Sequence, residues 1–387
     1  MKRKLKLAYI IPGLFYPSGM ERVLTAKVNY FVKKFDYEIH IFVTDGKGSE
    51  PYYPLDEKIK LHHLDINFDG IFSLPLVRRT LSYWKKQRLF KARLEEQLCL
   101  IKPDITVSLL RRDVNFINDL KDGSLKVGEL HFNRLVYRQF TDKRFPGFLQ
   151  RGISKLWQMQ LIKNLRKLSA FVVLTHEDAG YWHELNNISV ISNPLSFYPD
   201  KAALLNNKQV IAVGRMTYQK GFDLLIKAWQ MVARNHPDWV LKIYGGGDKD
   251  IYMSMVEELG LSSSCFLEDG TAEIAEKYND SSIFVLSSRY EGFPLVLGET
   301  MAYGVPPVSF MCPCGPRDII IDRKNGLLIE NGNIKQLADG ICLLIEDDAK
   351  RKEMGKNARN DVRKFDLENI AKQWQVLFES IRPVERS

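Results

Sequence analysis

The feature that most constrains this sequence is the run of apolar segments and glycine- or proline-containing turns between residues 283 and 310. Residues 283–286 are uniformly apolar, which is typical of a buried strand. Pro294 suits the first turn of a helix, where its missing N–H costs nothing, and Gly304 with the prolines after it is placed to end that helix. Strand, loop, helix and next strand in this order predict an open α/β sheet.

Two glutamates flank the start of this predicted helix. Glu291 lies in the loop after the strand, and Glu299 lies eight residues later, inside the helix. Ligands of open α/β sheets bind outside the carboxyl ends of the strands, and free N–H groups at a helix N-terminus attract anions such as phosphate. The two carboxylates suit hydroxyl groups better than a bare phosphate. A sugar nucleotide supplies both chemistries, and the loop formed by Gly292, Phe293, Pro294 and Leu295 would supply the N–H groups, apart from Pro294, which has none.

The letters EGFPLVLGE, followed by AYGVP, resemble the signature of retaining glycosyltransferases of family 4. The resemblance implies a GT-B architecture, with two doubly wound Rossmann-like domains facing each other across a cleft and a C-terminal helix that crosses back. It implies a nucleoside-diphosphate sugar as donor and co-substrate, no other cofactor and no metal. Glu291 would then accept hydrogen bonds from the donor sugar, and Glu299 would hold the ribose hydroxyls.

Further segments carry the same resemblance. The segment GR-x4-KG at 214–221 resembles the family's diphosphate-binding loop, so Arg215 and Lys220 are expected to stabilise the leaving group. Gly270 and Thr271 follow a predicted strand where the family places its base-binding turn. Gly19 belongs to a segment similar to GGxER, in which Ser18 replaces the first glycine. His131 lies in an EHN-like segment, in which Phe132 separates it from Asn133, and is expected to face the donor sugar.

The 387 residues are too many for one ordinary core. We expect an N-terminal acceptor-side domain at 1–196, a linker at 197–207, a nucleotide-sugar domain at 208–365, and a helix at 366–387 that returns to the first domain. The basic start of the chain leads into an apolar run that is broken by Pro12 and Gly13, without a cleavage motif. This start is interpreted as the first strand of a cytoplasmic protein.

Five scattered cysteines do not indicate a disulfide framework, and Cys312 with Cys314 lacks the second ligand pair of a metal site. The net charge of +9 is uneven: residues 1–200 carry +11 and the remainder carries −2, so an anionic partner is expected. Residues 76–93 mix seven cations with apolar and aromatic side chains and contain no acid, and residues 151–167 are a second basic segment. These segments predict peripheral docking on the anionic inner face of a membrane, where a glycan or lipid-linked acceptor is presented.

Two other functions fit parts of the sequence. A GT-B sugar-nucleotide epimerase would share the fold and release an isomerised donor. A non-enzymatic basic binding module would use the charge alone. No recognised nucleic-acid-binding motif is present. Nucleic acid is therefore not expected as a partner, and the sequence leaves the sugar, the base and the acceptor open.

Overall fold

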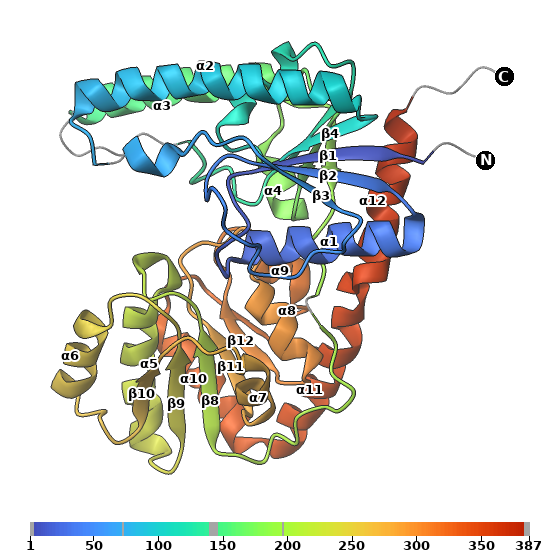
Figure 1. The fold of residues 1–387 in the computed structure, drawn as a ribbon. Helices are drawn as coiled ribbons and strands as arrows, with labels where there is room; N and C mark the ends of the chain where they lie inside the picture. The colour runs from blue at the N-terminus through green and yellow to red at the C-terminus, as the bar shows by residue number, and fades with distance from the viewer. Residues whose placement is uncertain (1–3, 72, 139–145, 196, 383–387) are drawn as a thin grey trace. The chain divides into compact units, whose positions relative to one another are not determined.

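A computed structural model describes residues 4–71, 73–138, 146–195 and 197–382 (Figure 1). The chain divides into two compact units. The first unit comprises residues 1–174, 178–194 and 367–387, and the second comprises residues 175–177 and 195–366. Within the described residues, no helix is long and apolar enough to cross a bilayer.

The first unit contains a parallel sheet with strand order β3-β2-β1-β4-β5-β6-β7. Its strands are β1 (Lys6–Ile11), β2 (Glu38–Val43), β3 (Lys60–His63), β4 (Ile105–Ser108), β5 (Leu125–Glu129), β6 (Ala170–Val173) and β7 (Ile188–Val190). The central strands are buried on both faces, as parallel sheets covered by helices require. The strand expected at the start of the chain is present as β1.

Helices cover both faces of this sheet (Figure 1). They are α1 (Gly19–Phe35), α2 (Leu76–Ile101), α3 (Gly147–Leu165), α4 (His176–Tyr181) and α12 (Leu367–Ile381), with 3-10 turns η1 (Phe68–Ile71), η2 (Asp113–Asn115) and η3 (Ile117–Asp119). Helix α2 begins at Leu76, after the turn η1 and Pro75, and contains the whole basic segment 76–93.

The C-terminal helix α12 packs on α1, as expected for the tail of the chain. Phe378 meets Phe31 with ring centroids 6.0 Å apart, and Trp374 is 1% exposed. The helix expected from residue 366 begins at Leu367. Residues Val362–Phe365 form the 3-10 turn η5, and α12 starts only after Asp366, whose backbone is extended.

The second unit contains a parallel sheet with strand order β10-β9-β8-β11-β12-β13. Its strands are β8 (Gln209–Val213), β9 (Val240–Tyr244), β10 (Cys265–Glu268), β11 (Ile283–Leu286), β12 (Pro307–Phe310) and β13 (Leu327–Ile329). Its helices are α5 (Phe222–Asn235), α6 (Asp250–Glu258), α7 (Ile274–Asn279), α8 (Leu295–Ala302), α9 (Pro316–Ile319), α10 (Ile334–Glu346) and α11 (Asp348–Asp361), with the 3-10 turn η4 (Tyr218–Lys220).

The amphipathic pattern of α5 shows why these segments fold as they do. Phe222, Leu225, Ile226 and Trp229 recur at helical spacing, and all four are buried against the sheet. The strands β8, β9 and β11 contribute apolar side chains to the same core. The predicted fold class, two parallel Rossmann-like α/β sheets, is confirmed.

Candidate active site

Four neighbouring strands of the second unit end in polar or glycine-rich loops. The loops follow β10, β9, β8 and β11, and the carboxyl ends of parallel strands share one edge of the sheet. The backbone N–H of Met216, after β8, donates to the carbonyl of Gly246, after β9, at 2.8 Å. The N–H of Arg289, after β11, donates to the carbonyl of Gln219 at 2.8 Å. The predicted diphosphate loop and the glutamate loop are therefore in direct contact.

A lysine and a glutamate pair at this edge. Lys220 Nζ lies 2.7 Å from Glu291 Oε1, and their side chains are 16% and 7% exposed. The Ser288 hydroxyl donates to the same carboxylate oxygen at 2.6 Å, and the Ser287 hydroxyl donates to the Lys220 carbonyl at 2.9 Å. Lys220 and Glu291 are therefore adjacent and largely shielded from water, although they lie in separate loops. The sequence predicts that both act on the same donor.

Glycine is required where these loops meet. A Cβ on Gly245 would lie 1.8 Å from the Gly214 carbonyl oxygen, so the loop after β9 can approach the loop after β8 only without a side chain. Gly221 has a φ of +63°, and a Cβ there would lie 2.1 Å from the Ser287 carbonyl oxygen. The second glycine of GR-x4-KG therefore fixes Lys220 against the Glu291 loop.

A second ion pair supports the loop. The Arg289 guanidinium donates to both carboxylate oxygens of Asp223, at 2.8 and 2.7 Å, and lies 3.9 Å from the centre of the Tyr218 ring. The hydrogen bonds from Arg289 lower the pKa of Asp223 from its usual value. Arg215 is exposed and makes no side-chain hydrogen bond or ion pair in the described part of the chain. Its charge is available to an anion from solvent.

Glu299 lies on α8, where its carboxylate accepts a hydrogen bond from the Tyr278 hydroxyl at 3.0 Å. Both residues are buried. Pro294 occupies the N-cap position of α8, one residue earlier than its predicted place in the first turn. The N–H groups of Leu295 and Val296 have no partner among the described residues, as expected at a helix start. Gly292 and Phe293 precede them, and the Phe293 ring packs edge-on against Phe365 at 5.3 Å.

The predicted base-binding turn follows β10, at the end of the same row of loops. Gly270 faces the glycine turn after β9, since a Cβ on it would lie 3.7 Å from the Gly246 nitrogen. The Thr271 hydroxyl accepts a hydrogen bond from the Glu273 N–H at 3.0 Å. The second unit therefore brings most of the predicted residues to one sheet edge: Arg215, Lys220, Gly270, Thr271, Glu291, Gly292, Phe293, Pro294, Leu295 and, one helix turn deeper, Glu299.

Two predicted residues belong to the first unit. Gly19 is the first residue of α1, where the Ser18 hydroxyl caps the helix by accepting from the Glu21 N–H at 3.3 Å. His131 follows β5, and its Nε2 lies 3.2 Å from Glu129 Oε1. Both side chains are nearly inaccessible, at 7% and 3% exposed.

Glu129 in turn pairs with Lys27, a residue that sequence analysis did not single out. Lys27 Nζ lies 2.6 and 2.5 Å from the two carboxylate oxygens, is 1% exposed, and lies 4.1 Å from the centre of the Trp374 ring. Burial alone would raise the pKa of Glu129, but Lys27 and His131 lower it to about 2. Burial lowers the pKa of Lys27, and the pairing opposes this without reversing it. The geometry supports a charged pair, because both oxygens contact the ammonium group.

Ser288, Tyr278 and Lys27 are the partners that sequence analysis missed. Lys27 carried a readable signal, because it lies on the apolar stripe of α1, four residues from both Val23 and Phe31. A lysine in such a stripe indicates a buried acidic partner. Ser288 and Tyr278 carried none, since their roles depend on contacts made only in the folded chain.

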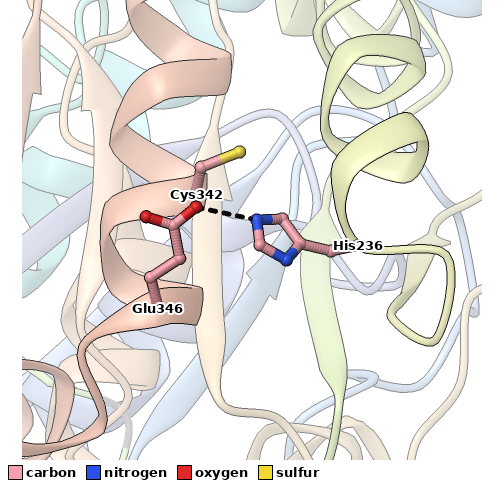
Figure 2. A group of neighbouring side chains, drawn as sticks. All are labelled: His236, Cys342 and Glu346. Carbon is pink, nitrogen blue, oxygen red and sulfur yellow. Dashed lines mark hydrogen bonds and ion pairs between the residues drawn. The ribbon is translucent and has the colours of Figure 1, made fainter.

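One group of metal-ligand side chains occurs among the described residues, at His236, Cys342 and Glu346 (Figure 2). Their ligand atoms lie within 4.8 Å of one another. Cys342 and Glu346 share one face of α10, and His236 Nε2 lies 3.1 Å from Glu346 Oε1. That hydrogen bond accounts for the approach of the two side chains, and burial raises the pKa of the Cys342 thiol, which disfavours a thiolate ligand. Cys312 and Cys314 are both buried free thiols.

The sequence profile described as "Glycosyl transferases group 1" matches residues 198–361, which include all ten residues of the sheet-edge site. Residues 198–361 of this chain belong to the glycosyl transferases group 1 family. An uncharacterized glycosyltransferase of Haemophilus influenzae is 29% identical over 96% of this chain and 99% of its own length. The Poly(ribitol-phosphate) alpha-N-acetylglucosaminyltransferase of Staphylococcus aureus is 33% identical over 65% of this chain, which spans 52% of that relative.

Another relative of this group 1 glycosyltransferase is named for a lipid-linked acceptor. The Campylobacter jejuni GalNAc-alpha-(1->4)-GalNAc-alpha-(1->3)-diNAcBac-PP-undecaprenol alpha-1,4-N-acetyl-D-galactosaminyltransferase is 24% identical over 98% of this chain and 99% of its own length. Among solved structures, a S. aureus TarM mutant in complex with fondaparinux, alpha-GlcNAc-glycerol and UDP has a TM-score of 0.76 at 20% identity, covering 97% of this chain and 99% of that one. This likeness confirms the predicted GT-B fold.

Proposed function

We propose that this group 1 glycosyltransferase moves a hexosyl unit, with retention of configuration, from a nucleoside-diphosphate sugar to an acceptor hydroxyl. The observation that carries the proposal is the shielded Lys220–Glu291 pair at the carboxyl edge of the second sheet, beside the unpartnered Arg215. The pair places an anion-binding group and a hydroxyl-accepting group within one ligand's reach. The UDP bound in the TarM structure supports a uridine diphosphate donor.

Each residue at this edge has a distinct role in the proposal. Arg215 and Lys220 stabilise the diphosphate as its charge grows, together with the free N–H groups at the start of α8. Glu291 accepts hydrogen bonds from the donor-sugar hydroxyls and favours positive charge at the anomeric carbon. Glu299 accepts from the ribose, with Tyr278 fixing its carboxylate. Gly270 and Thr271 receive the base, and Gly19 lets the backbone after β1 approach the donor.

The transfer step needs no covalent enzyme intermediate. The bond from the anomeric carbon to the diphosphate oxygen breaks, and the acceptor oxygen forms a new bond to that carbon on the same face. The acceptor proton passes to the departing diphosphate oxygen. His131 is proposed to face the donor sugar, as the family resemblance implies, with its ring orientation held by Glu129.

We place this reaction in cell-surface polysaccharide or glycolipid assembly. The names of two relatives support an acceptor that bears phosphate, either in a poly(ribitol phosphate) chain or on a polyprenyl diphosphate. The first unit offers a surface on which such an acceptor is presented. We define the helix surface as the exposed apolar residues Val77, Leu81, Phe148 and Leu156 with the exposed cations Arg78, Arg151 and Lys155.

This helix surface suits an anionic bilayer. The four apolar side chains are each at least 66% exposed, and each nearby cation adds about 1 kcal/mol at such a membrane. Sedimentation with vesicles of rising anionic-lipid content should show binding that weakens at high salt and on Leu81→Glu. Val376→Glu, an exposed apolar position on α12, is the matched control. No sedimentation with anionic vesicles at low salt contradicts docking and leaves the transfer proposal intact.

An activity assay distinguishes a glycosyltransferase from an epimerase and from a non-enzymatic binding module. Protein is incubated with UDP-, GDP- and ADP-sugars, with and without membrane glycolipids or polyol-phosphate acceptors, and the released nucleotide is measured. Release that depends on the acceptor supports transfer. An isomerised donor without an acceptor indicates an epimerase. Binding of no sugar nucleotide contradicts both enzymes and favours the basic binding module.

A further inference from the structure

A pocket in the first unit lies between α2 and α3, apart from the residues discussed above. Its volume is about 620 Å³, which is within the roughly 300–1,000 Å³ of small-molecule sites. Asn115, at the end of η2, lines it together with the following Phe116. Because η2 follows β4, the pocket lies beyond the carboxyl end of a central strand, the edge at which ligands of open α/β sheets bind.

The charge of the pocket is one-sided. Arg88, Lys91 and Arg138 line it, and none of its lining residues is acidic. Arg88 is exposed and has no side-chain partner in the described part of the chain. Lys91 lies 3.8 Å from the nearest carboxylate, Asp119, and Arg138 donates to the neutral amide oxygen of Asn115 at 2.7 Å. Three cations surround one cavity, and among the described residues only Lys91 has a carboxylate within ion-pair distance, so the cavity favours an anionic ligand.

Aromatic rings form the walls. Tyr83, Trp84 and Trp157 line the pocket, and the two tryptophans are 64% and 41% exposed. Large rings left in water beside a cavity gain by covering a flat apolar face, such as that of a sugar ring. Gln87 and Gln160 line the same cavity, where the Gln87 amide oxygen can accept from a hydroxyl group and the Gln160 amide offers both a donor and an acceptor. Rings, amides and cations together suit a saccharide or polyol that carries phosphate.

The floor of the pocket is held in place by hydrogen bonds. The Tyr83 hydroxyl accepts from the Gln87 amide at 2.8 Å and from the Asn115 amide at 3.5 Å. Both amides also donate to the Arg112 carbonyl, each at 3.2 Å. A floor fixed before the ligand arrives reduces the ordering cost of binding.

We propose that this pocket binds the phosphate-bearing part of the acceptor, a phosphate ester adjacent to a sugar or polyol. Arg88, Lys91 and Arg138 hold the phosphate oxygens, and Trp84 and Trp157 cover the ring or polyol chain. The inference rests on the proposed glycosyl transfer and locates its acceptor site. The same chemistry occurs on a prenyl-diphosphate sugar and on a polyol-phosphate chain, so the test includes both.

The test is isothermal titration of the full chain in the absence of donor. The probes are a synthetic glycerol-phosphate trimer, a short-chain prenyl diphosphate carrying N-acetylglucosamine, and a neutral trisaccharide of similar size. Arg88→Ala should lower the affinity for the phosphate probe about tenfold, since it removes a charge-assisted contact. Lys85→Ala removes the same charge from α2 outside the pocket lining and should change the affinity less than twofold. UDP is titrated in parallel into each variant, and thermal melting confirms folding.

Binding of a phosphate probe that is tighter than the trisaccharide and weakened by Arg88→Ala supports the pocket, and the probe that binds identifies the source. Equal binding of all three probes, no binding of either phosphate probe, or equal losses for Arg88→Ala and Lys85→Ala overturns it. If UDP binds but neither phosphate probe does, the pocket assignment fails while the transfer proposal stands. If a phosphate probe binds but UDP does not, the proposed function fails instead.

Discussion

Lys220 is the residue on which the proposed chemistry most depends, because it contacts Glu291 in the donor-free protein and would contact the diphosphate in the complex. Lys220→Ala should lower kcat on saturating donor on the order of 100-fold, since it removes a charge-assisted contact made mainly as the leaving group ionises. Lys227→Ala, at an exposed position on the following helix, is the matched control. Full turnover of Lys220→Ala would exclude this role.

Substitutions of Glu291 and Glu299 should alter different kinetic parameters. Glu299→Gln should mainly weaken nucleotide binding, because its carboxylate is fixed by Tyr278 for a ribose contact. Glu291→Gln should mainly lower kcat, because the neutral amide cannot favour positive charge at the anomeric carbon. Steady-state kinetics with titration of UDP measures both effects. If both substitutions alter only the affinity for acceptor, the assignment of the glutamates to the donor is wrong.

The buried Lys27–Glu129 pair gives a stability prediction. Lys27→Met leaves the Glu129 charge buried beside His131 alone and should cost about 3–5 kcal/mol in unfolding free energy at neutral pH. Glu129 has a folded pKa of about 2, below its ordinary value of 4.5. Its stabilisation is therefore complete above about pH 4.5 and is lost as the pH falls towards 2.

The cost of Lys27→Met should accordingly shrink over that same range of pH. Denaturant unfolding of wild type and variant at several pH values measures this change. The double variant Lys27→Met/Glu129→Leu, which removes both charges, should recover most of the lost stability. A cost that is independent of pH, or a double variant that is no more stable than the single one, would show that the pair is not charged.

At the level of loops, the glycine turn after β9 fits the diphosphate loop only because Gly245 has no side chain. Gly245→Ala should lower both the melting temperature and the affinity for UDP, since its Cβ would overlap the Gly214 carbonyl and push that loop away. Gly246→Ala is the control, because a Cβ there meets nothing within 4 Å. Equal melting temperatures and UDP affinities for the two variants would contradict the packing argument.

Elements with long, clearly patterned apolar runs could be predicted from the sequence. The buried strand β11 and the amphipathic helix α5 both fall where their patterns place them. Strand β3 (Lys60–His63) was missed, because it is a short edge strand without a fully buried residue. The 3-10 turn η5 before α12 was not predicted either, because Phe365 is held by contacts distant in sequence: its carbonyl accepts from the Leu195 N–H at 2.8 Å.

Residues of the candidate site were likewise predictable where they lie next to a clearly patterned apolar segment. Arg215, Lys220, Glu291 and Glu299 were predictable, because each lies in a loop or helix that directly follows a patterned strand. Contacts between side chains that are distant in sequence were not predictable. Glu129 and Lys27 are 102 residues apart, and no local pattern specifies that a β5 carboxylate meets an α1 ammonium group. The hydrogen bonds from Tyr278 to Glu299 and from Ser288 to Glu291 are likewise visible only in the folded chain.

At the scale of the whole molecule, the two units differ in net charge and in the kind of site that each carries. The excess positive charge lies in residues 1–200, with the helix surface and the α2–α3 pocket, while the slightly acidic remainder carries the sheet-edge site. This division is consistent with an acceptor bound through phosphate by the first unit and a donor bound by the second. The matched family profile covers residues 198–361, which include the sheet-edge site.

The central claim is same-face glycosyl transfer, and the stereochemistry of the product tests it most directly. Proton NMR follows the wild-type protein with an α-linked UDP-hexose and an acceptor that supports nucleotide release. Transfer with retention should make the first new glycosidic linkage α, formed as UDP appears in equal amount. A β linkage, or an isomerised UDP-sugar without any linkage, would contradict it.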